Sequence, residues 1–309
     1  MKCPICIQTS WNLIFDAKDR MFGVPGVFKE CRCDSCGLIA IHPQPTESKL
    51  ARHYPSTKYY SYADTGKQSF FGRLRSYYIS HLYSPTFISR LLNLFVHVPA
   101  MPIKKIHGKI LDIGCGSGET LVQLQSIGWE GYGLDMDKKA IEIAQKRGVK
   151  HASYGTYKDL KMYLDNTFDV IRLYHVIEHL DDPRRVLALI RTKLKVGGEL
   201  IIGTPNENSL VSRIFKQYWY NLDCPRHLYL FSPKTLRILV KQCSFINYTI
   251  EFSSAGGWIG SIQYVIEELF SADLDLINRQ WLVILVYSLE WILDRLRWGD
   301  VFVLRAWKS

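Results

Sequence analysis

The chain has 309 residues, which is enough for one large domain or for one full domain with a small attachment. Hydrophobic residues make up 47% of it and charged residues 22%, without any low-complexity tract. This composition indicates a soluble globular protein and excludes a disordered or collagen-like chain. The net charge of +10 suits nucleic acid, a phosphorylated or nucleotide-linked substrate, or an acidic membrane surface, and ordinary surface variation explains it equally well.

Two C-x-x-C pairs stand near the N-terminus, Cys3 with Cys6 and Cys33 with Cys36. Four thiolates complete a tetrahedral, structural Zn²⁺ site, so residues 1–45 are predicted to form a zinc ribbon that depends on its metal for folding. Cys31 could replace Cys33 at poorer spacing. A redox dithiol would leave the second pair unexplained. With no signal peptide before Cys3, we expect a cytoplasmic protein.

Residues 46–108 combine aromatic and basic side chains and predict two helices broken at Pro85. We expect either a lid that admits an anionic substrate or a plain pair of packing helices. Basic residues of this segment, with the first residue of the next, include Lys58, Lys67, Arg73, Arg75, Arg90, Lys104, Lys105 and Lys109.

The stretch KILDIGCGSG predicts an apolar strand that ends in a glycine-rich turn before an amphipathic helix. Gly114, Gly116 and Gly118 would let the backbone approach a ligand closely at a helix N-terminus. A dinucleotide-binding turn would have glycine where this chain has Glu119. Asp135 ends the next strand, where a carboxylate can accept the hydroxyls of a ribose.

Strands and helices continue to alternate, which predicts a doubly wound α/β fold with its ligands beyond the carboxyl ends of the strands. The expected helices are residues 138–148, 182–198 and 232–243, and the expected strands are residues 149–154, 168–176, 199–206, 245–252 and 301–308.

His175, Glu178 and His179 form an H-x-x-E-H string, which on a helix is typical of a zinc peptidase. Here a buried strand leads directly into the string, and Asp182-Pro183 begins the next helix. The string therefore belongs to a turn after the strand, and we reject the peptidase interpretation.

The segments ILDIGCGSG, GLDMD, FDVIRLYHVIEHLDDP, LKVGGELIIGTPN and PRHLYLFSPKTL resemble class I S-adenosylmethionine-dependent methyltransferases, especially bacterial ones with an N-terminal zinc ribbon that act on glycans and secondary metabolites. The resemblance implies a seven-stranded Rossmann-like sheet with an antiparallel last strand, here within residues 109–309. It also implies that Asp112 and the turn hold the methionine end of S-adenosylmethionine and that Asp135 holds its ribose. The cofactor-binding residues so expected are Asp112, Gly114, Cys115, Gly116, Gly118, Asp135 and Met136.

His175 follows the strand that faces the transferred methyl group, so it is a candidate base for a hydroxyl acceptor. Similar enzymes with E-x-x-E-H here bind magnesium. His175 replaces the first glutamate, so we do not expect Mg²⁺. Glu178 and His179 are further candidates, with capping of the following helix as the alternative.

A loop before residue 232 carries the other candidates for the acceptor site, since polar loop residues on such a scaffold are often functional. His227 is the second candidate base, with helix capping as its alternative. Arg226 could pair with an acceptor phosphate or carboxylate. Trp219 is the remaining candidate for acceptor binding.

Residues 254–298 form an insertion before the last strand whose apolar run is too short and too charged to span a bilayer. We consider a cover for the substrate pocket, a homodimer contact and a helix lying in a membrane interface.

Taken together, these features predict a methyltransferase for a small or carrier-linked anionic acceptor, most plainly a sugar hydroxyl. An RNA methyltransferase is one alternative, although the basic residues form no compact stripe and nucleic acid is not the expected partner. The other is a binding module that keeps the fold without catalysis.

Overall fold

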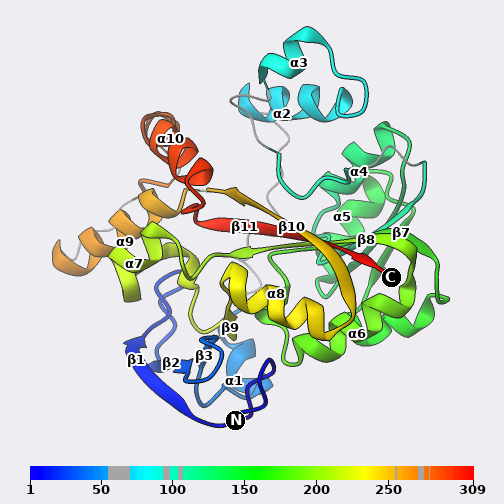
Figure 1. Ribbon diagram of the computed structural model, residues 1–309. Coiled ribbons are helices and arrows are strands. Elements are labelled where there is room, and N and C mark those ends of the chain that lie inside the picture. The colour runs from blue at the N-terminus through cyan, green and yellow to red at the C-terminus, as the bar shows by residue number, and fades with distance from the viewer. Residues whose placement is uncertain (55–69, 93–97, 104–106, 255, 271–274, 278) are drawn as a thin grey trace.

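The computed structural model describes residues 1–54, 70–92, 98–103, 107–254, 256–270, 275–277 and 279–309. Within these residues the chain forms a large sheet flanked by helices and a smaller sheet at the N-terminal end (Figure 1). Of the basic residues named above, Lys58, Lys67, Lys104 and Lys105 lie outside the described part of the chain.

The large sheet has seven strands in the order β10-β11-β8-β7-β4-β5-β6. Five strands pair in parallel, while β11 runs antiparallel to both β8 and β10, so β10 points the same way as those five. This confirms the doubly wound sheet with an antiparallel last strand. The strands are β4 (Lys109–Ile113), β5 (Glu130–Asp135), β6 (His151–Tyr154), β7 (Phe168–Tyr174), β8 (Leu194–Pro205), β10 (Phe245–Ser253) and β11 (Val301–Lys308).

Helices cover both faces of this sheet because neighbouring residues of a buried strand point to opposite sides. Leu111 packs with the helices α6 (Pro183–Lys193) and α8 (Pro233–Gln242) on one face. Ile110 packs with α4 (Glu119–Ser126) and α5 (Lys138–Lys146) on the other (Figure 1).

One predicted helix is shorter than the sequence indicated. We expected it to continue to the Gly197–Gly198 pair, but α6 ends at Lys193 and Leu194 already pairs with Phe168 of β7. The segment Leu194–Gly198 therefore belongs to β8.

The smaller sheet joins the N-terminal ribbon to the rest of the molecule. Its order is β1 (Trp11–Ala17), β2 (Phe28–Cys33), β3 (Ile39–Ile41) and β9 (Tyr229–Leu230), and β9 comes from the loop before α8. A short helix, α1 (Glu47–Ala51), follows the ribbon. Because β3 pairs with β9, the ribbon and the loop that carries His227 are parts of one sheet.

Two helices follow the ribbon as expected: α2 (Phe70–Ser80) and α3 (Phe87–Leu92). Arg75 of α2 donates hydrogen bonds to Glu119 and Gln123 of α4, the helix that begins at the glycine turn. In Figure 1 the pair lies above α4. This position is compatible with the lid interpretation.

The insertion contains α9 (Gly257–Phe270) and α10 (Gln280–Arg295), with α7 (Leu210–Phe215) packed beside α9. Among the described residues, no helix has the length and apolar character needed to cross a membrane. Apolar side chains of α10 and the residue after it face outward at helical spacing: Trp281, Ile284, Leu285, Leu289, Ile292 and Leu296.

Candidate active site

The glycine-rich turn lies at the carboxyl end of β4 and has the open conformation expected of it. Gly116 adopts a φ of +53°, and a Cβ atom there would meet nothing within 4 Å, so this side of the turn is free for a ligand. Gly118 has a φ of +75°, and a Cβ there would lie 2.9 Å from the Cβ of Ala144. Gly116 therefore leaves room for a ligand, and Gly118 lets α4 and α5 approach each other closely.

Asp135 lies beside this turn, at the carboxyl end of β5. Its Oδ2 accepts a hydrogen bond from the Gly116 amide at 2.8 Å, and its Oδ1 accepts one from the Asp137 amide at 2.8 Å. Burial raises the pKa of this carboxyl. Each carboxylate oxygen keeps a second lone pair, which fits the two hydroxyls of a ribose.

The other expected cofactor residues surround the same turn. Met136 is exposed directly after Asp135. A Cβ at Gly133 would lie 2.7 Å from the Cys115 sulfur, so this thiol packs against β5. Nη1 of Arg172 donates a hydrogen bond to each carboxylate oxygen of the buried Asp112, at 2.8 Å in both cases. Asp112 thus has a partner within the protein, and its contact with a cofactor stays a prediction.

His175 follows the last residue of β7 and adopts a φ of +55°, a conformation that is uncommon for a residue other than glycine. Strained residues of this kind concentrate at functional sites. Its side chain is 33% exposed, and its Nδ1 lies 3.2 Å from Oε1 of the buried Glu178. His175 is therefore an accessible imidazole held by a carboxylate.

Glu178 is the centre of a buried cluster that brings together all four predicted catalytic residues. Burial alone would raise its pKa, but the hydrogen bond and charge of His175, with the neighbouring histidines, lower it to about 2. Its Oε2 accepts a hydrogen bond from Thr204 at 2.9 Å. Nε2 of His227 lies 4.0 Å from its Oε1, and the rings of His179 and His227 are 4.7 Å apart.

The half-buried His179 and the buried His227 each place Nδ1 against a backbone carbonyl oxygen. Nδ1 of His179 lies 2.9 Å from the Arg226 carbonyl oxygen, and Nδ1 of His227 lies 3.0 Å from the Asn221 carbonyl oxygen. A carbonyl oxygen only accepts, so Nδ1 carries the proton in each ring and Nε2 keeps its lone pair. Burial lowers the pKa of His227 to about 4, which keeps this ring neutral at physiological pH.

Glu178, His179 and His227 could hold a metal ion, because one donor atom from each lies within 4.8 Å of the others. The backbone carbonyls on both Nδ1 atoms are the outer partners that metal-binding histidines usually have. Two imidazoles and one carboxylate suit Zn²⁺ or another transition ion better than Mg²⁺, which prefers oxygen ligands.

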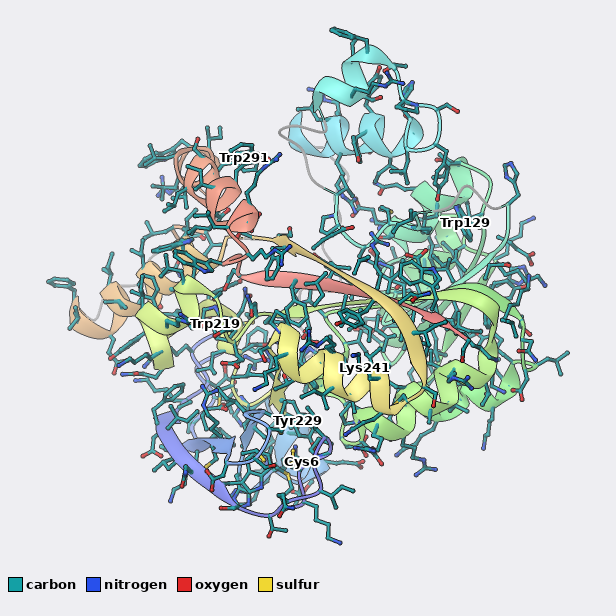
Figure 2. All side chains as sticks on the ribbon, in the orientation of Figure 1. Cys6, Trp129, Trp219, Tyr229, Lys241 and Trp291 are labelled. Carbon is teal, nitrogen blue, oxygen red and sulfur yellow. The ribbon has the colours of Figure 1, made fainter. Side chains whose placement is uncertain are left out.

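The predicted acceptor-binding roles of Arg226 and Trp219 are corrected by the structure. The Arg226 side chain is fully buried, and every nitrogen of its guanidinium group donates to Asp19, Asp223 or the His53 carbonyl oxygen. Trp219 is also buried and donates from Nε1 to Asp300 at 2.6 Å (Figure 2). Neither residue has a polar group left for an acceptor.

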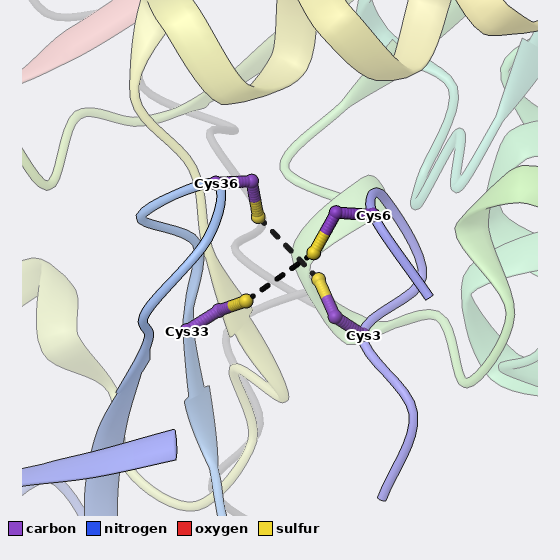
Figure 3. Close-up of side chains that lie close together, drawn as sticks. All are labelled: Cys3, Cys6, Cys33 and Cys36. Carbon is purple, nitrogen blue, oxygen red and sulfur yellow. Dashed lines mark hydrogen bonds between the residues drawn. The ribbon is translucent and has the colours of Figure 1, made fainter. Parts of the chain in front are cut away.

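The four predicted zinc ligands converge within the ribbon (Figure 3). The sulfurs of Cys3 and Cys36 lie 3.5 Å apart and those of Cys6 and Cys33 lie 3.4 Å apart, without a disulfide. Four sulfurs bound at about 2.3 Å to one zinc ion would be about 3.8 Å apart, so the arrangement fits that ion. Cys31 lies outside this group.

Sequence reasoning missed Thr204, Asp19 and His53. Thr204 holds Glu178, whereas Asp19 and His53 hold Arg226. Thr204 stands at the carboxyl end of β8, where a polar residue is a usable signal. Asp19 and His53 lie in segments with no pattern that connects them to residue 226.

Comparison with known proteins places this arrangement in a family. A family model described as "Methyltransferase domain" matches residues 79–249, more than half of the chain. The chain therefore belongs to this family of methyltransferase domains, and its α/β sheet is the Rossmann-like methyltransferase fold.

Several relatives are similar over a shorter stretch. A ubiquinone biosynthesis O-methyltransferase from Chromobacterium violaceum is 28% identical over 122 residues, which are 37% of this chain and 53% of that protein. Its counterpart from Vibrio parahaemolyticus is 30% identical over 105 residues, 32% of this chain and 45% of that protein. The chain thus spans about half the length of the relatives it matches.

Solved structures with a similar fold include a SAM-dependent methyltransferase from Archaeoglobus fulgidus, at 24% identity and a TM-score of 0.47 over 72% of this chain and 91% of that one. Another is Haemonchus contortus phosphoethanolamine N-methyltransferase 2 in complex with S-adenosyl-L-methionine. It is 19% identical, with a TM-score of 0.46 over 79% of this chain and 58% of that one.

Proposed function

We propose that this protein is an S-adenosylmethionine-dependent methyltransferase that methylates an oxygen of a small or carrier-linked acceptor. The observation that carries the proposal is the glycine turn, open at Gly116 and flanked by the Asp135 carboxylate. Family membership supports the type of reaction. The O-methyltransferase relatives favour oxygen as the acceptor atom.

In this proposal the residues divide the work of an in-line methyl transfer, in which alignment and removal of a proton are the main requirements. Asp135 and the turn would position the cofactor, which supplies the methyl group. His175 would take the proton of the acceptor hydroxyl, since its side chain is 33% exposed whereas that of His227 is buried, and Glu178 would stabilise its charged form.

The cluster of Glu178, His179 and His227 would assist this proton transfer by holding a metal ion. A divalent ion held there would bind an acceptor oxygen and lower its pKa. Titration of the zinc-loaded protein with more Zn²⁺ or with Mn²⁺ should detect this second site, and His227→Ala should remove it while the four-cysteine site stays filled. Equal metal binding by both proteins would contradict a metal-binding role.

The four-cysteine cluster would hold a structural zinc ion, and α2 with α3 would act as the lid that closes over the cofactor. The positions of the four sulfurs support the zinc site, and the hydrogen bonds of Arg75 to α4 support the lid. A sugar hydroxyl is the first acceptor to test, because the sequence motifs resemble those of ribbon-bearing enzymes of glycan biosynthesis.

The test is formation of S-adenosylhomocysteine from S-adenosylmethionine in the presence of candidate acceptors, beginning with nucleotide-linked sugars. His175→Ala should lower kcat about a hundredfold or more, the usual contribution of a general base, while cofactor binding is unchanged. An unchanged kcat would remove His175 from the mechanism. Turnover of RNA but of no small acceptor would instead support the RNA methyltransferase alternative.

A further inference from the structure

A cleft of about 640 Å³ lies between the ribbon, α8 and β10, away from the glycine turn. Its walls come from parts of the chain that are far apart in sequence: Arg32 of β2, Glu207 after β8, the first turns of α8, and Arg297 after α10. In Figure 1 the ribbon lies below α8, and β10 arches above that helix and down its right side. The fold therefore builds this cleft from the ribbon and the methyltransferase domain together.

The lining of the cleft is strongly cationic. Arg32, Lys234, Arg237 and Arg297 face a single carboxylate, that of Glu207, which lies 3.5 Å from Arg32. Within the described part of the chain, neither Lys234 nor Arg297 forms a salt bridge. Burial raises the pKa of Glu207, which weakens its hold on a full negative charge. The cleft thus has positive charge that the protein itself does not neutralise.

The start of α8 adds to this charge. The helix begins at Pro233 after the N-cap Ser232, and both residues line the cleft. The N-terminus of a helix carries partial positive charge and favours bound anions. Combined with the four cationic side chains, this makes the cleft suited to a multiply charged anion.

One wall is apolar and aromatic. Tyr248, Ile250 and Phe252 alternate along β10 and therefore share one side of the strand. The Arg237 guanidinium lies 5.6 Å from the centre of the Tyr248 ring and donates to its hydroxyl at 3.3 Å. An apolar wall next to cations fits a phosphate ester with an organic group better than it fits free phosphate.

The cleft lies close to the histidine cluster. Glu207 is three residues beyond Thr204, which donates a hydrogen bond to Glu178. Three residues of extended chain span at most about 11 Å. Glu207 and the histidine cluster therefore both lie at the carboxyl end of β8.

We propose that this cleft binds the diphosphate of a carrier-linked acceptor, so that Arg32, Lys234, Arg237 and Arg297 take the role that the sequence suggested for Arg226. This inference rests on the proposed function, because the bound diphosphate is taken to be part of the molecule that is methylated. Its binding step can be measured without methyl transfer.

The test compares two double variants of the zinc-loaded protein. Lys234→Gln/Arg297→Gln removes two cations from the cleft, whereas Lys146→Gln/Lys150→Gln removes two exposed cations at the far end of α5. Calorimetry would use pyrophosphate, UDP and geranyl diphosphate. We expect the wild type to bind a diphosphate, and the cleft variant to bind it at least about tenfold more weakly, as loss of charge-assisted hydrogen bonds predicts.

The control variant should bind like the wild type, and added salt should weaken binding. Tighter binding of UDP would identify a nucleotide carrier, and tighter binding of geranyl diphosphate a lipid carrier. Binding of none of the three probes, or equal binding by the wild type and the cleft variant, would overturn the inference. If the cleft binds a diphosphate but no acceptor is methylated, the proposed function fails and the anion site stands.

Discussion

At the scale of single residues, Arg226 shows how burial decides a role that the sequence leaves open. An arginine in a polar loop after an aromatic segment is typical of an anion contact. Asp19, 207 residues away in the chain, together with Asp223, instead encloses its guanidinium. No local sequence pattern predicts that Arg226 pairs with Asp19. The contribution of this pair to stability can be measured.

Replacing Arg226 by Met should destabilise the fold strongly, because Asp19 and Asp223 would remain buried without their counter-charge. Loss of one partner of a buried ion pair costs about 3–5 kcal/mol. Chemical denaturation measures the change in the free energy of unfolding. Arg185→Met, at an exposed position, is the control and should change it by less than about 0.5 kcal/mol. A loss below about 1 kcal/mol for Arg226→Met would contradict the buried network.

Glu30 gives the molecule a predictable dependence on pH. Its side chain is fully buried in β2, and burial raises its pKa to about 8, which the neighbouring Cys224 thiol only partly opposes. Between the ordinary carboxyl pKa of 4.5 and about 8, the unfolded chain loses this proton while the folded chain keeps it. Stability should therefore fall as the pH rises through this window.

The expected loss from Glu30 is about 3 kcal/mol between about pH 5.5 and 8, at 1.36 kcal/mol for each pH unit. Glu30→Gln should remove this loss in urea unfolding at the two pH values. Glu142→Gln, at an exposed position of α5, should leave it unchanged. The same decline in the wild type and in Glu30→Gln would show that another group is responsible.

At the scale of elements, the alternation of apolar strands and amphipathic helices predicted most of the large sheet. β11 and the start of β4 match the expected segments because buried strands have continuous apolar runs. β9 was not expected, because two residues carry no periodicity. It forms only where β3 offers an unpaired edge.

This pairing should connect the four-cysteine cluster to the loop that carries His227. Metal analysis should find about one zinc ion per chain in the ribbon. Cys33→Ser/Cys36→Ser should lose this ion and increase hydrogen exchange in residues 219–231, since β3 would no longer hold β9. Cys31→Ser, in the same strand as Cys33 but outside the cluster, should keep the zinc ion and leave hydrogen exchange in residues 219–231 unchanged. Unchanged exchange after loss of the metal would mean that the loop is independent of the ribbon.

At the scale of the whole molecule, the insertion leaves an apolar surface on α10 that the core does not use. Trp281 is 63% exposed and Leu285 is 70% exposed, whereas Leu293, about a quarter of a turn round the helix from Leu285, is 4% exposed. The apolar run predicts a helix but does not predict which of its sides is buried, because apolar residues occur all round it. A cover for the substrate pocket, a homodimer contact and a helix in a membrane interface remain predictions for the insertion. Substitutions on this apolar surface can test them.

Trp281→Gln/Leu285→Gln should change the free energy of unfolding by less than about 0.5 kcal/mol, since exposed side chains contribute little. Leu293→Ala should cost about 2–5 kcal/mol, as for other buried leucines. The double variant should also lose any self-association or vesicle binding that sedimentation detects in the wild type. A loss of stability as large as that of Leu293→Ala would show that both side chains are covered.

The proposed cofactor site consists of the turn at Gly116 and the carboxylate of Asp135, and methyl transfer depends on it most directly. Calorimetric titration of the protein with S-adenosylmethionine tests this directly. We expect one binding site per chain, weakened at least about tenfold by Asp135→Ala through the loss of charge-assisted hydrogen bonds, and unaffected by Asp165→Ala on the surface. Absence of binding by the wild type, or binding of a nicotinamide dinucleotide in its place, would contradict the account.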